Sequence, residues 1–139
     1  MNCAFKHRGW LCGVYAFFIL VLSAMPADTL ADNFEFFPHQ DKVLHALIYG
    51  GWAGLLYWAL QYKIQNHPLG WMLAIVTCVA LYGVMMEALQ ELLVWTGRVC
   101  SRGDMLANLA GAAVGAGLAD WIRRHFRGFG VDCRAGGNA

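Results

Sequence analysis

Charged residues are scarce in this sequence. Asp, Glu, Lys and Arg make up only 14% of its 139 residues, whereas 59% are hydrophobic, and the mean hydropathy is +0.46. A soluble domain carries about 25% charged residues, so this chain has too little polar surface to cover a core in water. No basic stripe is interleaved with aromatic residues in the way that nucleic-acid-binding proteins use. A nucleic-acid partner is therefore not expected.

Motifs of familiar catalytic and metal sites are also missing. The five cysteines form no CxxC pair, and their spacing does not match a metal site. We interpret them as small apolar packing residues or unpaired thiols. Neither a GxSxG nucleophile motif nor a Walker-type phosphate loop occurs. The sequence therefore points to no cofactor and to no specific reaction class.

Long apolar runs are what the sequence does contain. A helix needs roughly 17–25 predominantly apolar residues to span a bilayer. Pro68 precedes one such run, where a helix start tolerates proline, and Asp104 precedes another, where it can cap the helix and favour its dipole. The sequence predicts an all-α polytopic bundle of four transmembrane helices, at about residues 9–26, 42–62, 69–95 and 105–122.

The first of these segments has a second interpretation, as a cleaved signal peptide. It follows the basic residues "KHR", and "TLA" before Asp32 offers a candidate cleavage site. Cleavage would leave three spans and place the C-terminus on the side that its charges disfavour.

Lysine and arginine predict the orientation, because they are enriched in the cytoplasmic flanks of membrane helices. With the N-terminus inside, the inner flanks hold seven basic residues and the outer flanks three. The inner ones are Lys6, Arg8, Lys63, Arg123, Arg124, Arg127 and Arg134, and the outer ones are Lys42, Arg98 and Arg102. We therefore predict that both termini are cytoplasmic, with 1–8 as N-terminal flank, 9–124 as membrane domain and 125–139 as a flexible, Gly-rich tail.

Polar residues of three predicted helices then fall in the outer leaflet, while the inner halves of the same helices are apolar. A helix rises about 1.5 Å per residue. The depths below the outer boundary are about 6 Å for His45 and Asn108, about 8 Å for Gln90, and about 12 Å for Tyr49 and Glu87. An outer-leaflet polar cavity, walled by these three helices and open to the outside, is the expected arrangement.

Helical spacing assigns these polar residues to faces. Residues four apart lie on the same side of a helix, and small residues at that spacing let another backbone approach closely. Two helix faces therefore carry a stripe of such residues. The stripe on the second helix consists of Asp41, His45 and Tyr49, and the stripe on the fourth consists of Asp104, Asn108, Gly111 and Gly115. We expect Gly111 and Gly115 to serve helix packing.

Glu87 needs a partner in such a bundle. An ionised carboxylate near the bilayer centre costs about 2.5–3.5 kcal/mol, so Glu87 must be paired, hydrated or protonated. The candidate partners are His45, Lys42 and Arg98. No metal is expected at His45, because only His39 joins it on the outer side and the two have no ligand-pair spacing.

Three blocks carry the polar residues: "DKVLHALIYG", "YGVMMEALQELL" and "GRVCSRGDMLANLAGAAVG". Together they resemble the VanZ-like family of small bacterial membrane proteins, as does "LSAMP" at the end of the first segment. The resemblance covers about residues 10–122. The family pattern falls on Asp41, Lys42, His45 and Tyr49, on Glu87 and Gln90, and on Arg98, Asp104, Asn108, Gly111 and Gly115. Cys100 and Arg102 depart from it, so which arginine faces the site stays open.

The resemblance implies a place in the bacterial plasma membrane, a role in the cell envelope and a link to teicoplanin resistance, for which the family is named. It implies no settled biochemical activity, since most members are of unknown function. Whether the chain is an enzyme is therefore left undecided.

The first hypothesis is a site that binds or modifies an anionic envelope lipid or peptidoglycan precursor. Lys42 and Arg98 would hold a phosphate or carboxylate, with Asp104, Asn108, Gln90 and Tyr49 lining the site. His45, Asp41 and Glu87 would supply acid–base chemistry. The second hypothesis is non-enzymatic: a scaffold or small transporter whose polar residues form a structural network, with the glycine stripe as a candidate interface in a homo-oligomer.

The predicted topology can be tested with thiol chemistry. A membrane-impermeant thiol reagent added to intact cells should label Cys100, which lies in an outer loop, and should not label Cys3 or Cys133. Single-cysteine variants and mass spectrometry would identify the labelled site. Labelling of Cys133 in intact cells would contradict the topology.

Overall fold

The computed structural model describes residues 3–26, 39–93 and 101–126. Within these ranges the chain is all-helical and contains no β-strand, which confirms the all-α part of the prediction. Five helices make up the described chain: α1 (Cys3–Ala24), α3 (Gln40–Ala59), the short α4 (Gln61–Ile64), α5 (Pro68–Leu92) and α6 (Arg102–His125).

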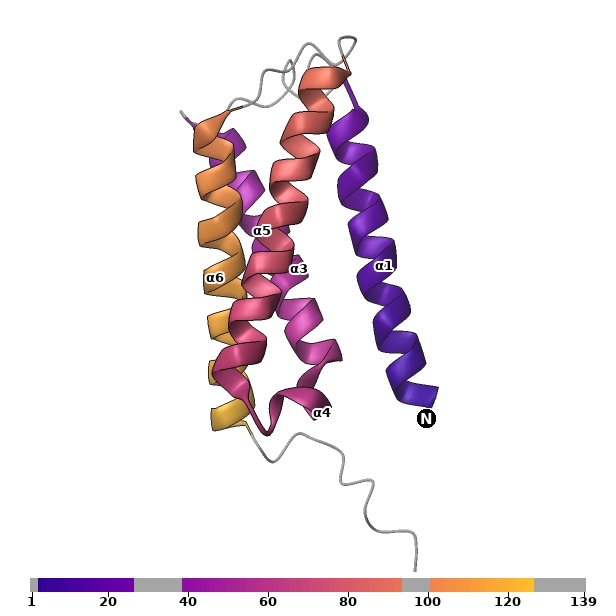
Figure 1. Cartoon of the computed structure of the whole chain (residues 1–139), viewed down its shortest axis with the longest axis vertical. Coiled ribbons are helices and arrows are strands. Elements are labelled where there is room, and N and C mark those ends of the chain that lie inside the picture. The colour runs from indigo at the N-terminus through magenta and orange to yellow at the C-terminus, as the bar shows by residue number, and fades with distance from the viewer. Residues whose placement is uncertain (1–2, 27–38, 94–100, 127–139) are drawn as a thin grey trace, which may run out of the picture.

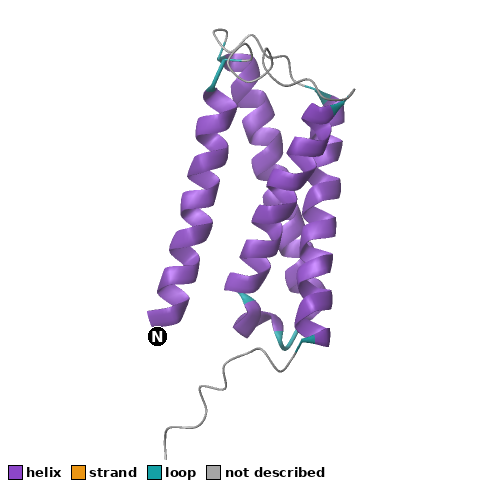
Figure 2. Cartoon of the chain, turned by 180° about the vertical axis from the view of Figure 1, so that it is seen from behind, coloured by secondary structure: helices purple, strands orange, loops and turns teal. Residues whose placement is uncertain are grey.

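The four long helices form an up-and-down bundle. Figure 1 shows that α1 and α5 run in one direction and that α3 and α6 run in the other. The start of α1 and the end of α6 therefore lie at the same end of the bundle, where α4 connects α3 to α5. The starts of α3 and α6 meet the end of α5 at the opposite end, as the reverse view also shows (Figure 2).

Helix boundaries differ from the predicted ones by a few residues. Pro68 is the first residue of α5, as expected of a residue that lacks a backbone N–H. In contrast, α6 begins at Arg102 after Ser101, so Asp104 lies inside its first turn instead of ahead of it. The expected capping role of Asp104 is therefore wrong, although a carboxylate in the first turn still favours the helix dipole.

The most extensive helix contact joins α3 and α6, which run parallel. A Cβ atom built on Gly111 would lie 2.7 Å from the Cα of Ala46, and one on Gly115 would lie 2.8 Å from the Cα of Gly50. Real Cβ atoms essentially never approach so closely. Both glycines are therefore required for the two backbones to touch, as the small-residue stripe predicts. Because α3 of the same chain covers this stripe, it is not free to join a second copy.

Helix α1 is attached to the other helices by hydrogen bonds that cross the bundle. In each bond, the side chain of an aromatic residue donates to a backbone carbonyl of a neighbouring helix. The bonds run from Tyr15 Oη to Ile48 (3.1 Å), from Trp52 Nε1 to Cys12 (3.2 Å) and from Tyr82 Oη to Ala16 (2.8 Å). They tie α1 to α3 and α5.

Large apolar side chains cover the outside of the bundle. Phe17 on α1, Leu47 on α3, Leu81 on α5 and Val114 on α6 are each 64–69% exposed. Helices α5 and α6 are long and apolar enough to cross a membrane, and only 22% and 28% of their spanning stretches are buried. Most of each spanning stretch therefore lies on the surface of the described bundle. The described apolar part of α1 is shorter, and α3 carries the charged Asp41 and Lys42 in its first turn.

Replacement of Gly115 by alanine should destabilise the bundle. The new methyl group would collide with the Gly50 backbone, and such overpacking typically costs about 1–3 kcal/mol. Gly117→Ala is the matched control, because nothing lies within 4 Å of a Cβ at that position and alanine is the better helix former by about 1 kcal/mol. Thermal unfolding in detergent should show a lower melting temperature for Gly115→Ala than for Gly117→Ala. Equal melting temperatures would contradict the close contact.

Candidate functional site

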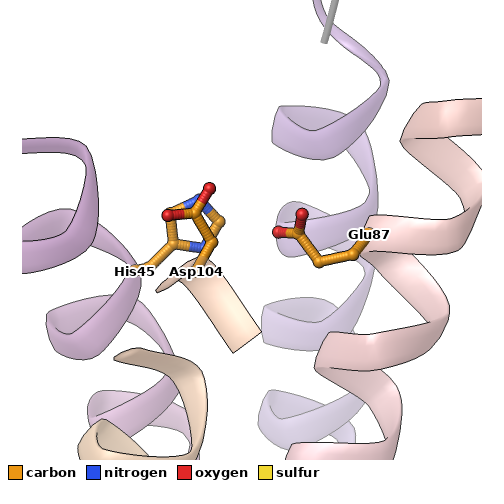
Figure 3. Close-up of side chains that lie close together, drawn as sticks. All are labelled: His45, Glu87 and Asp104. Atoms are coloured by element: carbon orange, nitrogen blue, oxygen red, sulfur yellow. The ribbon is translucent and has the colours of Figure 1, made fainter. Parts of the chain in front are cut away.

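Three helices bring a histidine and two carboxylates together where α3 and α6 begin. His45 from α3, Glu87 from α5 and Asp104 from α6 each offer one nitrogen or oxygen atom, and these atoms lie within 4.8 Å of one another. In Figure 3, Glu87 points from α5 toward the other two side chains. Glu87 is buried, at 2% exposure, and the other two are half-buried. We call these residues the His–Glu–Asp cluster.

Asn108 holds the imidazole of this cluster. It lies one turn below Asp104 on α6, is only 1% exposed, and its Oδ1 lies 3.0 Å from His45 Nδ1. Because an amide oxygen only accepts, the Nδ1–H of His45 donates this bond, which leaves a lone pair on Nε2 of the neutral ring. Tyr49, one turn further along α3, stacks on the imidazole with its ring centroid 6.2 Å away. The amide and the phenol ring thus fix the orientation of His45.

Lys42 connects the cluster to Asp41. Its Nζ donates to Asp104 Oδ1 at 3.2 Å and to Asp41 Oδ2 at 2.9 Å. Asp41 is exposed, and the Lys42 ammonium beside it lowers the pKa of its carboxyl. The structure therefore places Asp41 on the rim of the site, whereas Asp104 occupies the position beside His45.

Glu87 receives a partner that the sequence did not suggest. The backbone N–H of Ser101 donates to Glu87 Oε2 at 3.3 Å, just before α6 begins. Gln90, one turn after Glu87, is also buried. Of the predicted arginines, Arg98 lies outside the described residues and Arg102 is an exposed residue at the start of α6. A backbone donor depends on the path of a loop, which residue types alone do not reveal.

Gly83 is a site residue that sequence reasoning missed. A Cβ atom at Gly83 would lie 2.9 Å from Asn108 Nδ2 and 3.2 Å from Tyr49 Cε1. The missing side chain lets Asn108 and Tyr49 pack directly against α5. The available signal was the spacing, since Gly83 lies one turn before Glu87 on the same face of the helix.

The described charges around the cluster are mainly acidic. Lys42 pairs with Asp41 and Asp104, and Glu87 accepts the hydrogen bond from Ser101. In a poorly solvated setting, carboxylates this close together need a proton, a hydrogen-bond donor or a cation between them. The arrangement can therefore hold a cation or exchange protons with a bound group.

A second polar cluster lies at the opposite end of the bundle. Asp120 accepts a hydrogen bond from Tyr57 Oη at 2.5 Å and forms ion pairs with Arg123 at 2.8 Å and Arg124 at 2.6 Å. The expectation that the inner halves of the helices are apolar is thus wrong at this end. The i, i+3, i+4 spacing of "DWIRR" was a signal for the two ion pairs, whereas the contact with Tyr57 on α3 is visible only in the structure.

Comparisons with protein-family models, with curated proteins and with solved structures found no match to this chain.

The hydrogen bond between Tyr57 and Asp120 should contribute measurably to stability. Hydrogen bonds to charged groups typically contribute about 1.5–3 kcal/mol, so Tyr57→Phe should lower the free energy of unfolding by about that amount. Tyr62→Phe is the matched control, because Tyr62 is exposed on α4. Denaturant unfolding in detergent measures both variants. An equal loss of unfolding free energy in the two variants would show that the Tyr57–Asp120 hydrogen bond does not stabilise the protein.

Proposed function

We propose that this chain is a four-helix, multi-pass protein of a bacterial plasma membrane with both termini cytoplasmic. Two helices with the length and apolarity of membrane spans support this proposal, as do the exposed apolar side chains on all four long helices. Arg123 and Arg124 lie at the end of the bundle where α1 starts and α6 ends. Basic residues favour the cytoplasmic side, so the His–Glu–Asp cluster would face outward.

Membership of the VanZ-like class is part of this proposal. Of the three sequence blocks that carry the resemblance, the first is 31 residues from the second and the second is 3 residues from the third, yet their polar residues are neighbours in space. The first block contributes His45, the second contributes Glu87, and the third contributes Asp104 and Asn108. This convergence is what a shared functional site would require of the three blocks.

At this site, we infer, the protein binds the head group of an anionic envelope lipid or lipid-linked peptidoglycan precursor. The observation that carries the inference is the meeting of His45, Glu87 and Asp104 at one end of an apolar bundle. That end would lie at head-group depth. Lys42 has three N–H donors, of which Asp41 and Asp104 take two, so one remains for a phosphate oxygen.

Acid–base chemistry on the bound group is within reach of the same residues. Neutral His45 would present its free Nε2 as a proton acceptor, with Asn108 holding the required tautomer. Glu87, buried and within 4.8 Å of the imidazole, would exchange the proton with it. The two residues would thus move a proton at the head group, and Asp104 would keep Lys42 in place.

A structural network is the second candidate function, and one observation favours it. Lys42 joins carboxylates from two helices, Asp41 of α3 and Asp104 of α6. Such a bridge would also order the bundle without any ligand. In that case substitutions in the cluster would lower the amount of folded protein together with any phenotype.

Teicoplanin susceptibility in a sensitised bacterial host tests the proposed function. Cells with the wild-type chain should be protected relative to cells with no copy. Glu87→Gln at a matched membrane level should return susceptibility to that of cells with no copy, because the amide cannot take up the proton. Glu91→Gln is the matched control, since it makes the same chemical change one turn away at an exposed position; it should protect like wild type.

Two results would contradict the proposal. Protection that survives Glu87→Gln would remove this carboxylate from the function. If the wild-type chain gives no protection, the chain does not confer glycopeptide resistance. A parallel fall in protection and in folded protein would favour the structural network instead.

A further inference from the structure

We propose that the His–Glu–Asp cluster binds a divalent transition-metal ion of the Mn²⁺ or Zn²⁺ type. His45, Glu87 and Asp104 would be its three protein ligands, and Asn108 would orient the imidazole. The inference rests on the geometry of these residues and does not depend on the proposed head-group function.

The three donor atoms are almost close enough to share one ion. Bonds from Zn²⁺ to imidazole nitrogen and carboxylate oxygen measure about 2.0–2.2 Å, so two ligands on opposite sides of an ion are at most about 4.4 Å apart. The donor atoms of the cluster lie within 4.8 Å of one another. A small rotation of the Glu87 or Asp104 side chain would close the difference. The ligands come from three different helices, whose packing holds them in place.

Asn108 supplies a second, independent observation. Histidines that bind metals almost always donate their other ring N–H to an oxygen acceptor, which fixes the tautomer and the ring orientation. His45 does this through Nδ1 and the Asn108 oxygen. The Asn108 side chain is 99% buried, and its Nδ2 finds no hydrogen-bond partner in the described structure. This nitrogen points at Gly83, one turn before Glu87, and could donate to that carboxylate once it turns toward an ion.

Charge and ligand type favour a transition metal. Two carboxylate ligands balance the charge of a dication, and the dication would offset the cost of holding these carboxylates inside the bundle. An imidazole ligand suits Zn²⁺ and related metals, whereas carboxylates also suit Mn²⁺. Three protein ligands would leave coordination positions open for water or for an oxygen of a bound group.

The sequence argued against a metal because it compared His45 only with His39. The spacing of histidines within one segment does not reveal carboxylates that come from other helices. Glu87 and Asp104 lie 42 and 59 residues beyond His45 in the chain, and only the packing of α5 and α6 brings them to it.

Mn²⁺ titration of the full-length chain in detergent, followed by electron paramagnetic resonance, tests the site. Mn²⁺ is the probe because it prefers oxygen and nitrogen to thiolates, so the cysteines do not compete. We expect one Mn²⁺ per chain, displaced by one equivalent of Zn²⁺. Loss of a residue that hydrogen-bonds to a metal ligand typically weakens metal binding about 10–100-fold. Asn108→Ala should fall in that range, and His45→Ala, Glu87→Gln and Asp104→Asn should each lose more than about 100-fold.

Two further variants separate a metal site from a merely structural cluster. Glu91→Gln, the exposed control on α5, should bind Mn²⁺ like wild type. Lys42→Met should bind Mn²⁺ several-fold more tightly. The substitution removes the ammonium that lies 3.2 Å from Asp104 Oδ1 and competes with the ion for this oxygen. Misfolding cannot produce tighter binding, so this result would support the site even if other variants were unstable.

Clear results would overturn the proposal. One such result is that the wild-type chain binds no Mn²⁺ at millimolar concentration, and the other is that Glu91→Gln loses as much affinity as Glu87→Gln. Either result would exclude a metal at the His–Glu–Asp cluster. Because no head group or antibiotic takes part in the titration, this failure is distinct from a failure of the proposed function.

Discussion

The backbone contact between α3 and α6 is the constraint on which the rest of the structure depends. Gly111 and Gly115 let α6 lie directly on Ala46 and Gly50 of α3. The two helices run parallel, so a single register relates them along their whole length. A side chain larger than hydrogen at either glycine would separate the helices and change that register.

This register sets the polar contacts at both ends of the bundle. Lys42 pairs with Asp104, His45 with Asn108, and Tyr57 with Asp120, at sequence separations of 62, 63 and 63 residues. The near-constant separation is what two parallel helices of equal rise require. Helix α5 then completes the His–Glu–Asp cluster by supplying Glu87, and Gly83 lets α5 approach Asn108 and Tyr49 closely. The candidate site and the Asp120 cluster are therefore consequences of the same close packing.

An acidic group inside an apolar bundle is costly unless something compensates it. At one end, two arginines and a tyrosine compensate Asp120. At the other end, Lys42 pairs with Asp104, and the Ser101 N–H donates to Glu87. There a histidine and two carboxylates from three helices each bring one nitrogen or oxygen atom within 4.8 Å of the others. This convergence is the physical reason for the functional site that we propose.

The sequence alone determined the helical class, the approximate helices and the small-residue stripe, because apolar runs and i, i+4 spacing act locally. It also selected His45, Glu87, Asp104 and Asn108 as polar residues at similar depths. Only the tertiary structure decided which of them meet: Asp104 lies beside His45, while Asp41 stays on the rim. Contacts between helices about 60 residues apart depend on how their surfaces pack, and no local pattern encodes that.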